Sequence, residues 1–196
     1  LWKVAGDRIA AGTYCSGVMM AGGSVILKEV IPEQLEEPLI LFQRAGAVVK
    51  RERERLFICM KDRPDPLKIS TGPYPGFPTD MQSLFMAFLS IAKGKSCITE
   101  NVFEDRFGTA AELVKMGADI TCQGKTAVIK GVPLLTGTKV RALDLRGAAA
   151  LVMAALGAEG STIIEDCYHI KRGYEDICRD LRALGGRADW MESDTG

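Results

Sequence analysis

The residues best suited to chemistry in this sequence are one aspartate and three arginines. Asp80 carries a carboxylate that could take a proton from a hydroxyl group, as general base catalysis requires. Arg106, Arg146 and Arg172 carry planar guanidinium groups, which bind carboxylates and phosphates through paired hydrogen bonds. Together they could bind an anionic substrate and activate a hydroxyl beside it.

These residue types also have structural interpretations. Asp80 lies where a helix is expected to begin, and an acid there interacts favourably with the helix dipole. Thr79 and Gln82 have the spacing of a capping box, in which side chains bond the first backbone N–H groups of a helix. A single arginine is more often a surface ion-pair partner. Taken alone, the residue types leave both interpretations open.

Cysteine and histidine form no metal-binding pattern in the sequence. His169 is the single histidine, and no two cysteines have CxxC spacing, so zinc is not expected. Most of the cysteines lie within apolar stretches, as buried free thiols do, and a chain this long and apolar does not need a disulfide framework. A reducing cytosol is therefore expected. The cysteines are Cys15, Cys59, Cys97, Cys122, Cys167 and Cys178.

The overall composition excludes several classes of protein. The chain has 196 residues, 47% of them hydrophobic, which suits one compact domain or at most two small ones. Lys plus Arg and Asp plus Glu are both 25, so the basic excess typical of nucleic-acid-binding proteins is absent. The run 50–55 alternates in sign and is expected to be a solvated strand–turn–strand edge.

No segment of the sequence has the character of a membrane anchor. The longest apolar stretch, 147–158, is shorter than the ~20 residues needed to cross a bilayer. No signal peptide is seen at the start of the sequence. We therefore expect a cytoplasmic protein that binds neither membranes nor nucleic acids.

One set of landmarks occurs three times along the chain. Each copy has an aspartate, then a glycine before a short strand-like run, then a second glycine after an amphipathic helix. The spacings are nearly the same in every copy, which indicates three copies of one structural unit, at about 1–62, 63–134 and 135–196. The landmarks are Asp7, Gly23 and Gly46; Asp80, Gly94 and Gly117; Asp144, Gly160 and Gly185.

Each unit is expected to contain one buried helix and one exposed helix. The helices 81–92 and 145–158 are apolar on nearly every side, so they must be buried all round. The segments 112–116 and 176–181 have apolar residues at helical spacing beside charges, which predicts amphipathic helices. These helices are expected to end in left-handed caps at Gly117 and Gly185.

The predicted fold is therefore α/β, with three β-α-β-α-β-β units around a pseudo-threefold axis. The apolar helices lie inside it, and the sheets and amphipathic helices lie outside. Each unit closes with a hairpin, predicted in the second unit at 119–122 and 126–130. The third unit has room for only one hairpin strand, at 187–191, which suggests that the chain was cut from a longer one.

Four segments resemble one enzyme family. They are 74–82 (YPGFPTDMQ), 99–107 (TENVFEDRF), 144–146 (DLR) and 169–175 (HIKRGYE). They are similar, in residue type and in order, to signatures of the enolpyruvyl transferases that act on UDP-N-acetylglucosamine, and the resemblance covers essentially the whole chain. It implies a fold of two inside-out α/β barrels, each of three units. This chain resembles the barrel built mostly from the C-terminal half, and the N-terminal half is absent.

The resemblance also implies an activity. These enzymes transfer the enolpyruvyl group of phosphoenolpyruvate to the 3-hydroxyl of UDP-N-acetylglucosamine and release phosphate. This reaction is the first committed step of bacterial peptidoglycan synthesis. The family needs no metal or other cofactor, and its two domains close over the substrates. The chain alone is therefore expected to be inactive, with the missing N-terminal domain as its partner.

The family's charged site residues are matched one by one in this sequence. Asp80 resembles the carboxylate that takes the proton from the sugar hydroxyl. Arg146 and Arg172 match arginines that face the anionic substrate, and Arg106 matches a third arginine at the site. The resemblance implies that Asp80 and Arg172 are catalytic and that all four residues bind substrate.

Other positions of the resemblance contact the sugar nucleotide or depart from the family. Val102 and Phe103 resemble the stretch that contacts the sugar nucleotide through backbone and aromatic ring. The resemblance also places Asp144 among the substrate-binding residues, where it would either orient the arginine two residues later or cap the helix. Asp105 stands where the family more often has Asn, and Lys171 where it more often has Asp. None of the six cysteines matches the cysteine that the family carries on a loop of its other domain.

Two other functions remain open at this stage. The shikimate-pathway enolpyruvyl transferase shares the fold and phosphoenolpyruvate, but segment 74–82 favours the sugar-nucleotide branch. A non-catalytic module that binds a sugar nucleotide is the other alternative. The retention of Asp80 and the three arginines argues against it.

Overall fold

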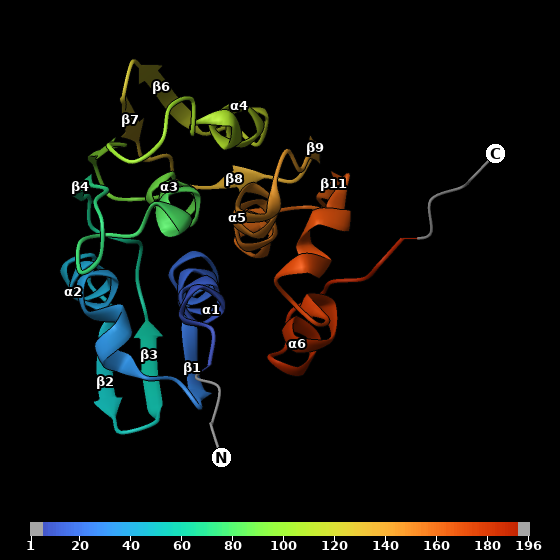
Figure 1. Cartoon of the computed structure of the whole chain (residues 1–196). Coiled ribbons are helices and arrows are strands. Elements are labelled where there is room, and N and C mark those ends of the chain that lie inside the picture. The colour runs from blue at the N-terminus through green and yellow to red at the C-terminus, as the bar shows by residue number, and fades with distance from the viewer. Residues whose placement is uncertain (1–5, 192–196) are drawn as a thin grey trace.

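Three helices lie at the centre of the structure, where the apolar sequence patterns predicted buried helices (Figure 1). They are α1 (Arg8–Ala21), α3 (Gln82–Leu89) and α5 (Leu145–Leu156), and each packs against the other two. The computed structural model describes residues 6–191. All residues of α3 are buried, so this helix has no solvent-facing side. The predicted helix 81–92 is shorter than expected, because it begins as the 3-10 helix η2 (Thr79–Met81) and its regular part stops at Leu89.

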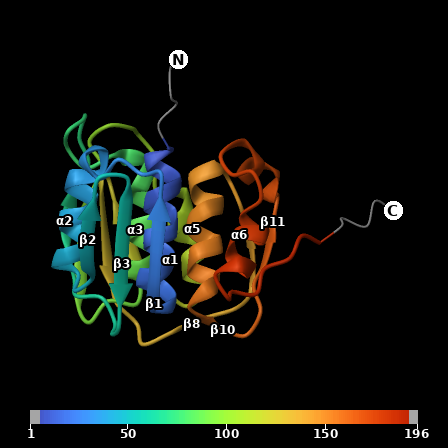
Figure 2. The same cartoon turned by 90° about the horizontal axis from the view of Figure 1, so that it is seen from below.

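Sheets and further helices surround the central three (Figures 1 and 2). The first sheet is antiparallel, with the order β1-β3-β2, and the second has the order β4-β5-β7-β6, with β4 and β5 parallel. The strands of the first sheet are β1 (Gly23–Lys28), β2 (Val48–Glu52) and β3 (Arg55–Met60). Those of the second are β4 (Lys68–Ser70), β5 (Lys95–Thr99), β6 (Asp119–Gln123) and β7 (Thr126–Lys130). The outer helices of this part are η1 (Pro32–Leu35), α2 (Glu36–Arg44) and α4 (Gly108–Lys115).

The last third of the described chain has shorter strands. They form two parallel pairs, β8 (Leu135–Thr136) with β10 (Ala158–Glu159), and β9 (Lys139–Arg141) with β11 (Ile163–Glu165). The 3-10 helix η3 (Cys167–Arg172) packs against α5, and helix α6 (Ile177–Ala183) follows it. Tyr14 on α1 donates a hydrogen bond to Asp180 on α6 over 2.7 Å, so the first and last parts of the chain are joined.

The outer α-helices α2, α4 and α6 end in the same way. Gly46, Gly117 and Gly185 have φ of 101°, 93° and 90°, a left-handed conformation that suits glycine. The next residue in each case donates its N–H to a carbonyl five positions back, which is the main bond of a Schellman cap. The predicted caps at Gly117 and Gly185 are thus confirmed, and each turns the chain from an outer helix toward the following segment.

The strand predicted at 187–191 is not found, so this prediction is wrong. In the other two hairpins, the first strands β2 and β6 pair with the return strands β3 and β7. No strand pairs with 187–191 among residues 6–191. An extended segment without a hydrogen-bonding neighbour leaves its backbone groups unpaired, and it does not form a strand.

Two smaller predictions have different outcomes. The run 50–55 lies across the end of β2, a turn and the start of β3, and it is solvent-exposed, as predicted. The expectation that most cysteines are buried is wrong: all six are free, but only Cys15 and Cys178 are buried. Cys122 is exposed on β6, an edge strand of its sheet. Within residues 6–191, no helix has the length and apolar character needed to cross a membrane.

Candidate functional site

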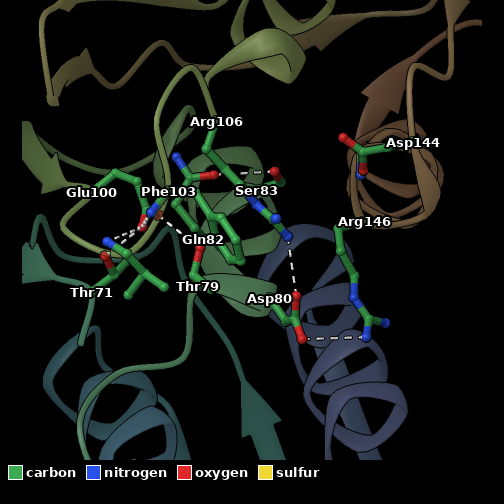
Figure 3. Close-up of polar contacts among 12 residues, drawn as sticks. Thr71, Thr79, Asp80, Gln82, Ser83, Glu100, Phe103, Arg106, Asp144 and Arg146 are labelled. Atoms are coloured by element: carbon green, nitrogen blue, oxygen red, sulfur yellow. Dashed lines mark hydrogen bonds and ion pairs between the residues drawn. The ribbon is translucent and has the colours of Figure 1, made fainter. Parts of the chain in front are cut away.

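Asp80 lies between two arginines that come from distant parts of the sequence (Figure 3). Arg106 Nη2 is 3.0 Å from Asp80 Oδ1, and Arg146 Nη2 is 3.5 Å from Asp80 Oδ2. The side chains are only partly shielded, with exposures of 42% for Asp80, 25% for Arg106 and 21% for Arg146. The cluster therefore carries a net positive charge and is open to a ligand from solvent.

The central helices bring these three residues together. Asp80 is in η2, directly before α3, whereas Arg146 is in the first turn of α5, and α3 packs against α5. Arg106 is in the loop before α4, which also contacts α3. Twenty-six residues separate Asp80 from Arg106, and 66 separate it from Arg146, so only the fold makes them neighbours.

The capping box expected at Thr79 and Gln82 does not form. Neither η2 nor α3 has a side-chain hydrogen bond at its N-cap. Thr79 Oγ1 instead donates to Glu100 Oε2 over 2.9 Å, and Gln82 is fully buried beside Ser83. The capping-box prediction is therefore wrong, whereas Asp80 does lie in the first turn of η2, where its charge suits the helix dipole, and it also faces two arginines.

Tyr174 lies against the Arg146 side of the cluster. Its hydroxyl is 2.6 Å from Thr13 Oγ1 of α1. Burial raises the pKa of the Tyr174 phenol, while the hydrogen bond with Thr13 and the nearby Arg146 guanidinium act in the opposite direction. Tyr174 thus stays protonated at neutral pH and joins α1 to the segment that follows η3.

Phe103 lies beside Arg106 on the other side of the cluster. The Arg106 guanidinium carbon is 4.9 Å from the centre of the Phe103 ring, a cation–π contact that helps to orient the arginine. The ring is 50% exposed, so Phe103 is not a core residue, and Val102 next to it is also exposed. An exposed aromatic ring beside a cation is suited to contact with a ligand.

The backbone N–H groups of Val102 and Phe103 are already occupied. They donate to Glu100 Oε1 over 2.9 and 3.1 Å, respectively. Any backbone contact of these two residues with a ligand must therefore use their carbonyl groups. Phe103 and Arg106 also line, together with Glu100 and the Gly124–Lys125 turn, a cavity of about 240 Å³.

The other two predicted site residues lie outside this contact network. Asp144 is the N-cap of α5 and accepts a hydrogen bond from Gly147 N over 2.8 Å. Its carboxylate points away from the Arg146 guanidinium (Figure 3), which supports the helix-cap interpretation. Arg172 is exposed at the end of η3, and no ion pair with Asp80 is found for it within residues 6–191.

The arrangement can bind an anion and accept a proton at one place. The two guanidinium groups provide paired donors for a carboxylate or phosphate, and Asp80 provides an acceptor between them. Across the described residues, no group of three or more His, Cys, Asp or Glu side chains could hold a metal ion.

Comparison with known proteins identifies the family. The family model of EPSP synthase (3-phosphoshikimate 1-carboxyvinyltransferase) matches residues 1–181. The chain belongs to the enolpyruvyl transferase family. It is 47% identical over 186 residues to a UDP-N-acetylglucosamine 1-carboxyvinyltransferase of Desulfofundulus thermocisternus, with 95% of this chain and 76% of that protein covered. The Aeromonas hydrophila enzyme of the same description is 43% identical over 189 residues, or 96% of this chain and 45% of that one.

A solved structure also places this domain in the enolpyruvyl transferase family. The enolpyruvyl transferase NikO from Streptomyces tendae superposes with a TM-score of 0.83 at 29% identity, covering 93% of this chain and 44% of the other. The fold is thus a mixed α/β domain of this type. The chain spans less than half the length of this structure and of the Aeromonas relative.

The two departures from the enolpyruvyl transferase pattern each have a structural account. Asp105 has φ of 50°, a left-handed conformation in which both Asn and Asp are enriched, so it meets the same backbone requirement as the usual Asn. The Lys171 ammonium lies 4.9 Å from the centre of the Trp190 ring, so this lysine has a cation–π partner of its own.

Proposed function

We propose that this chain is one domain of an enolpyruvyl transferase that uses phosphoenolpyruvate and UDP-N-acetylglucosamine. The observation that carries the proposal is the Asp80 carboxylate held between Arg106 and Arg146 in a solvent-accessible position. The 43–47% identity to proteins described as UDP-N-acetylglucosamine 1-carboxyvinyltransferases supports the choice of the sugar nucleotide as acceptor. The reaction would be the committed step of peptidoglycan synthesis in the bacterial cytoplasm.

In the proposed reaction, Asp80 takes the proton of the sugar 3-hydroxyl. The hydroxyl oxygen adds to C2 of phosphoenolpyruvate while C3 takes up a proton, so C2 becomes tetrahedral. Loss of a proton from C3 re-forms the double bond as the bond between C2 and the phosphate oxygen breaks and phosphate leaves. Asp80 then returns its proton to solvent. The products are the enolpyruvyl ether of the sugar nucleotide and inorganic phosphate. The residues of this chain supply the proton acceptor and fixed positive charge, and no metal or cofactor enters the scheme.

The arginines act by binding anionic groups of the substrate. Phosphoenolpyruvate carries a carboxylate and a phosphate, and guanidinium groups bind both with paired hydrogen bonds. Arg106 and Arg146 contact Asp80, so an anionic substrate would compete for them and release the carboxylate. Arg172, exposed on η3, would be the catalytic arginine that joins when substrate binds. Val102 and Phe103 would contact the sugar nucleotide, and Asp144 would support Arg146 only through the helix that it caps.

The site is proposed to be completed by a second domain. The Aeromonas relative is more than twice as long as the matched region, which leaves room for another domain of similar size. We infer that the present chain is the three-unit inside-out barrel, with repeats near 1–62, 63–134 and 135–196. On its own the chain would hold only part of the active site and would be inactive.

The test is phosphate release from phosphoenolpyruvate, measured with this chain alone and with the remaining part of the Aeromonas relative supplied in trans or by fusion. Release with UDP-N-acetylglucosamine, only in the completed protein, is the expected result. Release with shikimate 3-phosphate instead would move the assignment to the other branch of the family. Tight binding of the sugar nucleotide without phosphate release in a folded, associated complex would indicate a non-catalytic module.

The Asp80→Asn variant tests the proton acceptor in the same assay. We expect turnover to fall by about 100-fold or more, the range that general base catalysis contributes. Asp119→Asn is the matched control, because Asp119 forms only a surface ion pair with Lys130. Equal turnover in the two variants would remove Asp80 from the mechanism.

A further inference from the structure

We infer that Glu100 is a positioning residue of the proposed site: its buried carboxylate ties the segment that carries Asp80 to the loop that carries Val102, Phe103 and Arg106. This inference rests on the proposed function and adds a residue that neither the sequence motifs nor the comparisons assign. It concerns a side chain that does not touch substrate and acts through its neighbours.

Glu100 accepts four hydrogen bonds from two separate loops (Figure 3). Oε1 accepts from Thr71 Oγ1 over 2.8 Å and from the N–H groups of Val102 and Phe103. Oε2 accepts from Thr79 Oγ1 over 2.9 Å. Both oxygens are thus used, one mainly by the loop after β5 and the other by the segment that leads into α3.

The hydrogen-bond directions show that Glu100 acts as an acceptor only. The Val102 and Phe103 N–H groups can only donate. Thr71 Oγ1 already accepts from Asn101 N over 2.8 Å, so its hydroxyl proton is free to donate to Glu100. Four donors around the two oxygens match the acceptor capacity of a carboxylate. Glu100 is therefore a carboxylate that is only 1% exposed and is compensated by neutral donors.

A buried carboxylate of this kind contributes little net stability to a fold, because its desolvation opposes folding. Taking a charge out of water is costly unless it is paired, and no Lys or Arg side chain forms an ion pair with Glu100 among the described residues. Apolar residues of similar volume often fill such positions with equal or better stability. The feature that Glu100 supplies, and an apolar side chain would not, is a fixed junction between two polar loops.

The junction lies one residue from the proton acceptor. Thr79 directly precedes Asp80, so the bond from Thr79 to Glu100 holds the backbone at Asp80 while Arg106 and Arg146 hold its carboxylate. Asn101 strengthens the same junction, because its Nδ2 donates to Ser70 Oγ and to the Thr71 carbonyl. A shift of Glu100 would change the distance between Asp80 and the Phe103–Arg106 loop.

The first part of the test is independent of activity. Amide hydrogen exchange of this chain would be compared for wild type, Glu100→Ala and Glu100→Gln. We expect fast exchange at Val102 and Phe103 in Glu100→Ala, because their acceptor is gone. In Glu100→Gln the amide oxygen can still accept these bonds and the NH₂ group can donate to Thr79, so protection should persist. Unchanged protection in Glu100→Ala would overturn the inference.

The second part measures turnover in the completed enzyme. We expect Glu100→Ala to lower kcat by about 100-fold, the cost of a misplacement on the order of 1 Å, and Glu100→Gln to recover most of it. Glu112→Ala is the matched control: Glu112 is also buried and also bonds a backbone N–H, that of Arg141, but it joins α4 to β9 away from the site. Its kcat should be that of wild type.

Besides unchanged protection in Glu100→Ala, three outcomes would overturn the inference while leaving the proposed function intact. In the first, Glu100→Ala is as active as Glu112→Ala. In the second, Glu100→Gln keeps its amide protection but is as inactive as Glu100→Ala. In the third, the double variant Thr79→Val/Glu100→Ala loses kcat by the product of the two single losses. If the two residues act through their shared hydrogen bond, the double variant should be no less active than Glu100→Ala alone. Absence of phosphate release by the wild type with every acceptor would instead refute the proposed function.

Discussion

Replacing Arg63 by alanine is expected to destabilise the folded chain strongly, although its hydrogen bonds go to backbone carbonyls and not to residues of the proposed site. Its guanidinium donates to three backbone carbonyls: Nε to Ile91 O at 2.9 Å, and Nη2 to Ala92 O at 3.0 Å and to Val132 O at 2.9 Å. Two of these carbonyls lie just after the end of α3, where a positive charge also interacts favourably with the helix dipole.

The expected magnitude follows from the three bonds. A hydrogen bond to a charged group contributes about 1.5–3 kcal/mol when shielded, and a typical one about 1 kcal/mol. Since the guanidinium is only partly buried, we take the lower figure for each bond. The loss in the free energy of unfolding is then about 3 kcal/mol for Arg63→Ala. Arg63→Lys, which keeps the charge but lacks the planar fork, should fall between that value and wild type.

The assay is equilibrium unfolding in urea, followed by far-UV circular dichroism. Arg53→Ala is the control, because Arg53 lies in the exposed turn between β2 and β3, and it should change the free energy of unfolding by less than about 0.5 kcal/mol. If Arg63→Ala cost no more than Arg53→Ala, the three carbonyls would be adequately hydrated without Arg63, and the reasoning would be wrong.

Three further predictions concern other sites. Burial acts to raise the pKa of Glu112, but hydrogen bonds from Lys115 and Arg141 N outweigh burial and hold the pKa below its ordinary value of 4.5. The stability that the Glu112 carboxylate contributes is therefore present above pH 4.5 and is lost as the pH falls through the folded-state pKa. Acid unfolding should accordingly be less pH-dependent in Glu112→Gln. Burial raises the pKa of Cys15 to about 12, so iodoacetamide should modify Cys122 in the folded chain and Cys15 only after unfolding; mass spectrometry showing early Cys15 labelling would contradict this. Asp144→Ala should cost about 1 kcal/mol of unfolding free energy as a lost helix cap, with kcat in the completed enzyme reduced less than threefold, and a large loss of kcat at unchanged stability would favour the orienting role instead.

The sequence predicted the elements of the fold better than the contacts of the site. The apolar helices around 81–92 and 145–158 could be predicted as buried because no side of either helix is polar. Gly117 and Gly185 could be predicted as caps because glycine tolerates positive φ at the end of a helix. The segment 187–191 was predicted as a strand from its place in the third repeated unit, and it is not one because a strand also depends on a hydrogen-bonding neighbour.

The contacts of Asp80 could not be predicted from residue types. Arg106 and Arg146 were each matched by resemblance, but a shared ion pair between residues so far apart in sequence depends on how α3, α4 and the first turn of α5 pack. Glu100 was missed because a glutamate after a strand resembles an ordinary solvated charge. The alternation of β5 was the available signal: Ser96 and Ile98 face inward, and Glu100 continues the same parity.

Because α1, α3 and α5 each pack against the other two, none of them can be removed without exposing the rest. In a solenoid, each repeat touches only its neighbours, so repeats can be added or deleted one at a time. Here each central helix contacts both of the others, and a Cβ on Gly12 of α1 would lie within 2.3 Å of Met81 at the start of α3. Removing one third of the chain would expose apolar faces on the other two helices at once. The three central helices thus form one closed set, and we expect them to fold together as one cooperative unit.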